Sequence, residues 1–502
     1  MTVHLRVNDA ATGRPTPCRL RIAGTNGEYF APFGRVAEFS VGTNEDVGGQ
    51  LYLGNKRYAY IDGACEIRLP TGVPLDLEIT KGLEFAPIRE TVTLGSGKMA
   101  LRFTLQRHLD TRAEGWLSAD TRCHFLSPHS ALLEAAAEDI GFAHLLATVK
   151  DIPSQDGRLY RTIANMPAFS GQRAALEADG HSVIVNTLNT HPALGRLALL
   201  NCHRPVYPLS FGTFDEGDDW SLGDWCDQCH RKKGLVLWCD AFRPEAGLPG
   251  GEALIAAILG KVDALEFDAR ERSQPFLPIW YRLLDAGLCL PLVGASAKDG
   301  NRVAMGSMRT YTLMEGEGRG LADWVEQTRK GRTFVTNGPI LDFRVDGQPP
   351  GSRLVRTNGS EKRSIVATAR SLAPFDRLEI VANGRVVAEA FPSGSPHEAR
   401  IEAELSLPDG GWIAARCRGQ AKPEIYPSMP VFAHSSPVDV RIEGKERRAT
   451  AESLAWLRQL VEQTRDWIET TGQFAEEKSK VHLLGLCEAA MNEFDNAEPR
   501  TE

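Results

Sequence analysis

The stretch that decides the fold is Gly115–Asp151, GWLSADTRCHFLSPHSALLEAAAEDIGFAHLLATVKD. Its apolar pattern predicts a strand, a loop broken by Ser-Pro, an amphipathic helix and a second, buried strand. Residues two apart in an extended segment share a face, so Asp120, Arg122 and His124 are expected to point the same way. The sites of barrel-like α/β folds lie at such strand ends. We therefore expect a functional site here.

The remaining chain predicts a multidomain α+β protein around this unit. Residues 1–112 alternate polar and apolar side chains between turn clusters, which predicts an antiparallel β-sandwich similar to carboxypeptidase-regulatory-like and immunoglobulin-like modules. Residues 113–340 alternate strand and helix signals, as a layered α/β domain does. Residues 341–446 return to short strands and predict a second β-sandwich. Residues 447–495 predict a helical hairpin, packed on the body of the protein or on a second subunit of a homo-oligomer.

Composition narrows the classes of partner. The 502 residues are 42% hydrophobic and 24% charged, with a net charge of -8 and a pI near 5.9. The sequence also has no block of Lys and Arg. This charge balance argues against a nucleic-acid partner and against an anionic-membrane partner. No run approaches the roughly 18 apolar residues that a membrane span needs.

The N-terminus and the cysteines predict a reducing, cytoplasmic location. MTVHLRVNDAATG alternates at once and has no basic or apolar region of a signal peptide, although export stays open if the start site is assigned wrongly. Ten cysteines are scattered through apolar or helical contexts. We interpret them as small buried hydrophobes and not as a disulfide framework.

Four segments carry a resemblance to a known family. They are the motif GW-S-DT-x-C-HFLSP-x-ALLEA-AE, the segment GRLALLNCHRPVYPLSFG (195–212), WYRLL (280–284) and GRTFVTNGPIL (331–341). Together they resemble the CehA/McbA-type metallohydrolases, a branch of the PHP (polymerase and histidinol phosphatase) superfamily. The resemblance implies a PHP-like distorted β/α barrel of seven units over 113–340. It also implies metal-activated water that cleaves ester, carbamate or phosphoester bonds.

The metal-binding positions depart from that family. Its strand-end motif is Asp-x-His-x-His, in which both histidines bind metal; here Arg122 stands at the first and His124 at the second. Arg196 also stands where a histidine is expected, and Ala297 where an aspartate is expected, with Asp299 two residues on. Arginine has no acceptor atom and does not lose its proton, so it cannot ligate a cation.

Two functional hypotheses follow. In the first, arginine replaces the metal charge beside Asp120 and Asp240, and the chain is a catalytically weak or inactive relative with a binding role and no metal. In the second, it is an ester or phosphoester hydrolase whose reduced site holds Zn, Mn or Fe. The ligands would be Asp120, His124, His191 and Asp240; the catalytic residues remain unassigned.

The same residues predict what the barrel pocket would contain. Arg122, Arg196, Glu138 and Asp299 are its expected lining. Two guanidinium groups in one pocket favour a small-molecule anion such as a phosphate or a carboxylate, bound bidentately.

One further motif formally matches c-type haem attachment. Cys226-Asp227-Gln228-Cys229-His230 is a C-x-x-C-H string, but its helical context and single occurrence favour a helix with incidental cysteines over haem. A zinc half-site completed by Cys239 and His203 is the alternative. We otherwise expect His203 to be hydrogen-bonded near the core, and Glu134 and Glu138 to be solvated carboxylates on one helix face.

Overall fold

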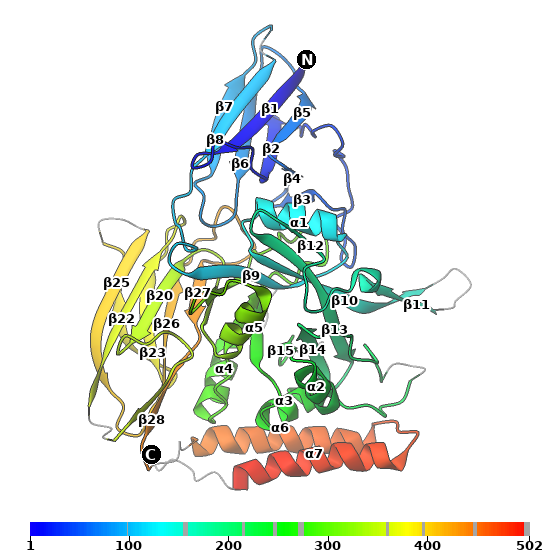
Figure 1. Cartoon of the computed structure of the whole chain (residues 1–502), viewed down its shortest axis with the longest axis vertical. Coiled ribbons are helices and arrows are strands. Elements are labelled where there is room, and N and C mark those ends of the chain that lie inside the picture. Colours follow the sequence, from blue (N-terminus) through cyan, green and yellow to red (C-terminus); the bar gives the residue numbers. More distant parts are fainter. Residues whose placement is uncertain are drawn as a thin grey trace.

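The computed structural model describes residues 1–97, 99–153, 159–212, 216–243, 248–269, 276–357, 361–393, 397–444 and 449–495. Figure 1 shows a central α/β region with a curled sheet, an N-terminal and a C-terminal β region next to it, and two long helices along one end. The protein is thus a multidomain α+β protein. The boundaries predicted at residues 112, 340 and 446 remain predictions.

The N-terminal strands form two sheets that share one apolar core. Alternate residues such as Leu5, Leu20 and Leu77 are fully or almost fully buried between the sheets, because successive side chains of a strand point to opposite faces. The three-stranded sheet contains β5 (Ala64–Arg68), β1 (Thr2–Asp9) and β8 (Ala100–Leu105). The five-stranded sheet contains β3 (Gln50–Leu53), β4 (Lys56–Ile61), β2 (Cys18–Gly24), β6 (Pro74–Thr80) and β7 (Ile88–Thr93).

The central region is a curled sheet with helices outside it (Figure 1). Its strands, in neighbouring order, are β9 (Trp116–Cys123), β10 (Phe142–Pro153), β13 (His181–His191), β14 (Gly195–Leu200), β15 (Leu235–Cys239), β16 (Ala264–Asp268) and β17 (Leu292–Ala295). The sheet curls until β17 returns beside β9, where Thr121 donates a hydrogen bond to the Gly294 carbonyl at 3.2 Å. The helices are α1 (Pro128–Ala137), α2 (Leu222–Arg231), α3 (Gly251–Ile258), α4 (Phe276–Asp285) and α5 (Leu321–Arg329).

The predicted succession of parallel strands is only partly correct. Strands β9, β10 and β13 are parallel neighbours, as are β15, β16 and β17. Strand β14, however, is antiparallel to both β13 and β15, because only residues 192–194 connect it to β13 and a crossover needs a dozen residues or more. Strand β18 (Arg309–Leu313) is antiparallel to β9 and to β19 (Thr333–Thr336). This sheet is therefore not built from seven repeated strand–helix units.

Shorter elements extend this region. Strand β11 (Leu159–Ala164) forms a hairpin with the far half of β10, and β12 (Leu176–Ala178) pairs with the start of β13. A single 3-10 turn, Met166–Ala168, lies between them.

The C-terminal strands continue the central sheet through β27, which pairs with β19. One sheet holds β21 (Arg353–Arg356), β23 (Arg377–Ala382), β24 (Arg385–Ala390), β26 (Gly411–Arg418), β27 (Phe432–Ser435) and β28 (Val438–Ile442). The facing sheet holds β20 (Ile340–Val345), β22 (Lys362–Arg370) and β25 (Glu398–Ser406). Asn383, with φ of 46°, and Gly384, with φ of 77°, form the predicted tight turn between β23 and β24.

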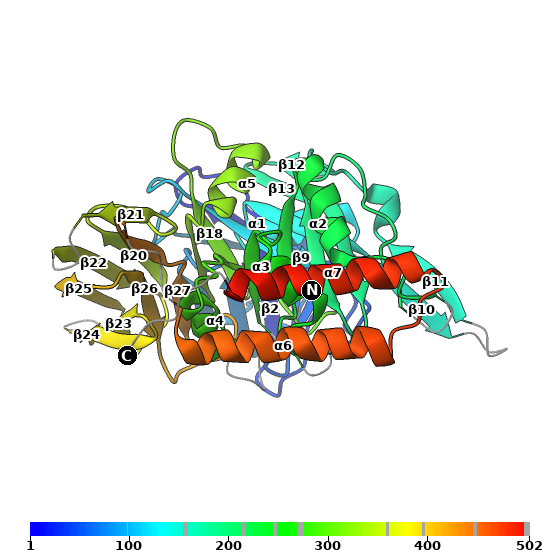
Figure 2. The same cartoon turned by 90° about the horizontal axis from the view of Figure 1, so that it is seen from below.

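Helices α6 (Ala451–Thr470) and α7 (Glu477–Asp495) form the predicted hairpin, which packs on the body of the protein (Figure 2). Leu457, Val461 and Cys487 join the same apolar core as Trp225 of α2 and Leu254 of α3. At its other contacts the Trp456 ring stacks on Phe242 after β15, and the Trp467 ring meets the edge of His191 at the end of β13. The hairpin therefore covers loops at the carboxyl ends of the central strands.

Candidate functional site

Three strands of the curled sheet, β9, β15 and β16, bring four charged side chains together near their carboxyl ends. Strand β9 contributes Arg122, the residue after β15 is Asp240, and β16 contributes Glu266 and Asp268. Glu266 and Asp268 share a face because they lie two apart in a strand. All four side chains are at most 4% exposed. The site is thus a buried charged cluster at the place where the sequence predicts one.

The guanidinium of Arg122 lies at the centre of three carboxylates. Its Nη2 is 2.6 Å from Oε1 of Glu266, 2.9 Å from Oδ2 of Asp268 and 3.1 Å from Oδ1 of Asp240. Its Nη1 donates to the second Asp240 oxygen at 3.2 Å, which makes the Arg122–Asp240 pair bidentate. One nitrogen therefore occupies the point on which three acidic side chains converge.

Two further arginines complete the network from its rim. Arg196 Nη1 donates to Asp240 at 2.8 Å, and Arg243 Nη2 donates to Asp268 at 2.6 Å. The side chains of Arg196 and Arg243 remain 35% and 28% exposed. Three guanidinium groups thus face three carboxylates, and only the two rim arginines reach solvent.

Burial controls the protonation of the cluster. It raises the pKa of Glu266 to about 7, against the opposing charge of Arg122. Burial alone would lower the pKa of Arg122, but the charges of Asp240 and Glu266 raise it well above its ordinary value. Arg122 is therefore permanently charged, whereas Glu266 exchanges its proton near neutral pH.

Asp120 lies outside this network. The pairing of β9 with β10 shifts register between Asp120 and Cys123, so the alternation that was expected to aim Asp120 and Arg122 the same way is interrupted here. Its carboxylate accepts hydrogen bonds from the Ser296 hydroxyl and from the backbone N–H groups of Arg122, Ser296 and Gly306, the last at 2.7 Å. Burial raises the pKa of Asp120 despite these donors. Asp120 thereby ties the end of β9 to the loop after β17, and the expectation that an arginine neutralises it is wrong.

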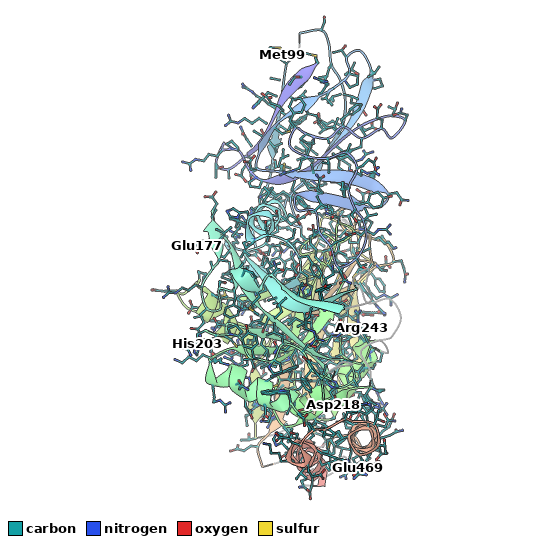
Figure 3. All side chains as sticks on the ribbon, turned by 90° about the vertical axis from the view of Figure 1, so that its right-hand side faces the viewer. Met99, Glu177, His203, Asp218, Arg243 and Glu469 are labelled. Atoms are coloured by element: carbon teal, nitrogen blue, oxygen red, sulfur yellow. The ribbon has the colours of Figure 1, made fainter. Side chains whose placement is uncertain are left out.

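The two histidines predicted as ligands have other partners. His124 Nδ1 lies 3.2 Å from the Leu146 carbonyl, to which it must donate. His191 Nδ1 accepts from the backbone N–H groups of Ala193 and Leu194, so its Nε2 carries the proton and donates to Asp218 at 2.8 Å. Figure 3 shows Asp218 directly beside the helical hairpin that bears Glu469. His191 is thus a structural link to the hairpin.

Glu138 and Asp299, two expected pocket residues, also lie elsewhere. Glu138 is fully buried after α1, accepts from Tyr60 at 2.8 Å and Tyr426 at 2.6 Å, and pairs with Arg19 at 3.2 Å. It connects the N-terminal strands, the barrel and the loop before β27. The Asp299 carbonyl accepts from the N–H of Glu45 in the N-terminal region at 3.0 Å.

Glu134, predicted to be solvated like Glu138, is also fully buried. It lies 3.6 Å from the buried ammonium of Lys298, which pairs with Asp46 at 2.8 Å. Burial raises the pKa of Glu134 to about 8. The i, i+4 spacing of Glu134 and Glu138 therefore did not indicate exposure to solvent, because the N-terminal sheet covers this face of α1.

The residues present do not fit a metal ion while Arg122 holds this position. One oxygen each of Asp240, Glu266 and Asp268 lie within 4.8 Å of one another, a spacing that could suit a cation. A cation there would lie against the fixed positive charge of Arg122. Of the predicted ligands only Asp240 belongs to this cluster. Sequence reasoning missed Glu266, Asp268 and Arg243, although ALEFD reads as a buried strand with two acidic residues on one face, a pattern that needs a partner.

The C-x-x-C-H string lies on α2, as predicted for incidental cysteines. Cys226 and Cys229 are buried, and Cys239 lies against Glu266 in the charged cluster. His203 is exposed and projects from the edge of the molecule (Figure 3), so the prediction of a core position for it is wrong. In the described part of the chain these side chains form no group of three metal ligands.

Comparison with known proteins gives little beyond this geometry. No family model matches the chain, and no curated protein matches it. Two solved structures are similar to part of it: endonuclease Q in complex with a 27-mer duplex substrate with an abasic lesion, and the lesion-specific endonuclease Q of Pyrococcus furiosus. Both are 12% identical over 43% of this chain, with TM-scores of 0.26 and 0.25. The match spans 56% and 55% of the endonuclease chains, and likeness at this level transfers no residue role.

The sequence-based exclusion of a nucleic-acid partner is nevertheless withdrawn. One of the similar structures holds a duplex substrate, and the net charge of a whole chain does not determine the charge of one surface. Within the described residues, no helix has the length and apolar character required to cross a membrane.

Proposed function

We propose that this protein is a CehA/McbA-like relative in the PHP superfamily whose metal centre has been replaced by an arginine. It would act by binding an anionic group and not by metal-dependent hydrolysis. The observation that supports this proposal is the position of Arg122 Nη2, at 2.6 to 3.1 Å from all three carboxylates of the acidic cluster. The guanidinium supplies the positive charge that such a cluster needs when buried.

The energetics favour a permanent replacement. Asp240 is held bidentately by Arg122 and again by Arg196, so a metal would have to displace charge-assisted hydrogen bonds in a buried site. Expelling the Arg122 side chain would also leave a guanidinium without partners, which costs several kcal/mol in a low-dielectric interior. A metal ion competes poorly against both costs.

The rim of the cluster supports the anion-binding role. Both Nη atoms of Arg122 donate to carboxylates, which argues against the bidentate anion site first expected on Arg122 and Arg196. Arg196 and Arg243 instead keep solvent-facing surface. When Glu266 is protonated, three guanidinium groups face two carboxylates and the cluster carries one net positive charge. A phosphate or carboxylate group at the rim would neutralise it.

Elemental analysis of protein purified without chelator tests the first half of the proposal. Zn, Mn and Fe each below about a tenth of an equivalent are expected, because bound metal would have to enter the arginine-filled cluster. Stoichiometric metal would overturn it, provided that Asp268→Asn removes the metal.

Calorimetric titration with inorganic phosphate tests the second half. The double variant Arg196→Ala/Arg243→Ala is expected to lose binding at least tenfold, since it removes both rim guanidinium groups. Arg204→Ala, at an exposed arginine elsewhere, serves as the matched control and should bind as the wild type does. Equal binding by all three proteins would count against a rim site.

A reduced-site hydrolase is the second candidate. The convergence of Asp240, Glu266 and Asp268 oxygens within 4.8 Å favours it, because three carboxylates could ligate a hard or borderline cation. It differs from the ligand set expected from the sequence, which relied on His124 and His191. The same elemental analysis distinguishes the two candidates.

A further inference from the structure

Two cysteines from different elements meet at the end of the sheet opposite the charged cluster. Cys202 follows β14, and Cys229 lies in the last turn of α2. Their sulfur atoms are 3.2 Å apart and joined by a hydrogen bond. They are 1% and 0% exposed. All ten cysteines lie in the described part of the chain as free thiols, and in this pair the two sulfurs contact each other.

The backbone around the pair makes room for both sulfurs. A Cβ atom added at Gly234 would lie 2.4 Å from Sγ of Cys229 and 2.6 Å from Sγ of Cys202. Such distances are far shorter than carbon–sulfur contact allows, so no larger residue fits between α2 and β15 without moving the thiols. The Gly234 N–H donates to the Cys229 carbonyl at 2.9 Å, which fixes the end of the helix against the sheet.

We propose that Cys202 and Cys229 are a peroxide-sensitive dithiol that closes to a reversible disulfide. The Cys202 thiolate attacks one oxygen of hydrogen peroxide, the O–O bond breaks, and the leaving hydroxide takes a proton to become water. Cys229, losing its proton, then attacks the sulfenic acid sulfur of Cys202, and a second water leaves. Two thiols are oxidised, one peroxide is reduced to two waters, and no other reactant is needed.

The surroundings suit these roles. The hydrogen bond between the sulfurs lowers the pKa of the Cys202 thiol, whereas burial raises that of Cys229 well above its ordinary value. Cys202 is therefore the better initial nucleophile and Cys229 the resolving thiol. A pocket of about 710 Å³ is lined by Asn201, His230 and Lys233, the immediate neighbours of the two cysteines and of Gly234. A molecule as small as hydrogen peroxide can approach the pair from there.

The test treats the reduced full-length protein with about one equivalent of hydrogen peroxide, followed by thiol counting after denaturation and peptide mapping without reductant. The expected result is loss of two of the ten thiols, a linked Cys202–Cys229 peptide, and recovery of both thiols with dithiothreitol. The wild-type protein alone answers the question, so a variant that fails to fold does not prevent a result. Absence of the linked peptide, or stable sulfinic acid at Cys202 in its place, would overturn the proposal.

Variants assign the two roles. Cys229→Ser is expected to accumulate sulfenic acid at Cys202, detectable with dimedone, while Cys202→Ser should label weakly at Cys229. Cys226→Ser is the matched control: it is buried on the same helix, and the disulfide should form as in the wild type. If Cys226→Ser lost the linked peptide as completely as Cys202→Ser does, or if urea-unfolded protein linked the pair equally fast, native proximity would not be the cause and the inference would fail.

Discussion

Arg122 and Glu266 approach to 2.6 Å between Nη2 and Oε1, with both side chains almost completely shielded from solvent. Even so, the pKa of Glu266 is raised to about 7, because burial outweighs the attraction of a guanidinium that Asp240 and Asp268 also share. The protein therefore retains a proton on Glu266 near neutral pH. The free energy of unfolding should therefore depend on pH in this range.

Glu266→Gln is expected to weaken the dependence of stability on pH. Between the unfolded pKa of about 4.5 and the folded value of about 7, the native state holds a proton that the unfolded state has lost, so stability falls as pH rises through this window. Glutamine mimics the protonated acid. Relative to the wild type, the variant should gain about 2.5 kcal/mol in free energy of unfolding between pH 5 and pH 8.

Urea denaturation at several pH values measures this gain. Glu134, whose pKa is raised to about 8, contributes the same sign and remains in both proteins. The exposed Glu462 provides the control, since Glu462→Gln should leave the pH dependence unchanged. A constant difference between Glu266→Gln and the wild type from pH 5 to pH 8 would contradict the expected protonation.

Arg122→Ala is expected to destabilise the fold by about 3–5 kcal/mol at pH 8. It leaves Asp240, Glu266 and Asp268 buried without their central cation, and uncompensated buried charge is strongly unfavourable. Arg196→Ala, which removes a rim guanidinium that is about a third exposed, should cost no more than about 1 kcal/mol. Equal losses in chemical denaturation would mean that Arg122 does not hold the cluster together.

The parts of the site that depend on neighbouring residues in the sequence were predictable. Asp120 and Arg122 do lie in one strand, which His124 directly follows, and Arg122 does pair with Asp240. The apolar stripes of 451–470 and 476–494 also predicted the two C-terminal helices to within one residue at each end. In each case the information lies within a few neighbouring residues.

The remainder depends on contacts between segments far apart in the sequence. Glu138 resembles a solvated helix residue until Tyr60 and Tyr426 enclose it from two other regions. Similarly, His191 resembles a ligand until the loop between α6 and α7 meets its partner: Asp218 accepts from the Gln473 N–H at 2.6 Å. A local sequence pattern cannot indicate a partner that lies more than 250 residues away in the chain.

The junction around Glu138 gives a third prediction. Tyr426→Phe removes a hydroxyl that donates to Glu138 at 2.6 Å and accepts from Arg309 at 2.7 Å, both in the interior. The expected loss is about 1–3 kcal/mol in free energy of unfolding, because two charged groups lose a buried partner. Tyr52→Phe is the control, since its long 3.4 Å contact to Asn55 is exposed. Tyr426→Phe as stable as Tyr52→Phe would show that the junction contributes nothing.

Arg122→His should convert the cluster into a metal site. The substitution removes the fixed charge that opposes a cation and places a neutral imidazole beside Asp240, Glu266 and Asp268, whose oxygens already lie within 4.8 Å of one another. About one equivalent of zinc or manganese is expected after equilibration and desalting, against less than about a tenth in the wild type. Arg122→Gln separates the two effects, because it removes the charge but offers a weaker ligand, and it should bind at least tenfold more weakly than Arg122→His. Metal binding equal in the wild type and Arg122→His would show that the guanidinium does not exclude the ion, and the arginine-replacement proposal would then fail with it.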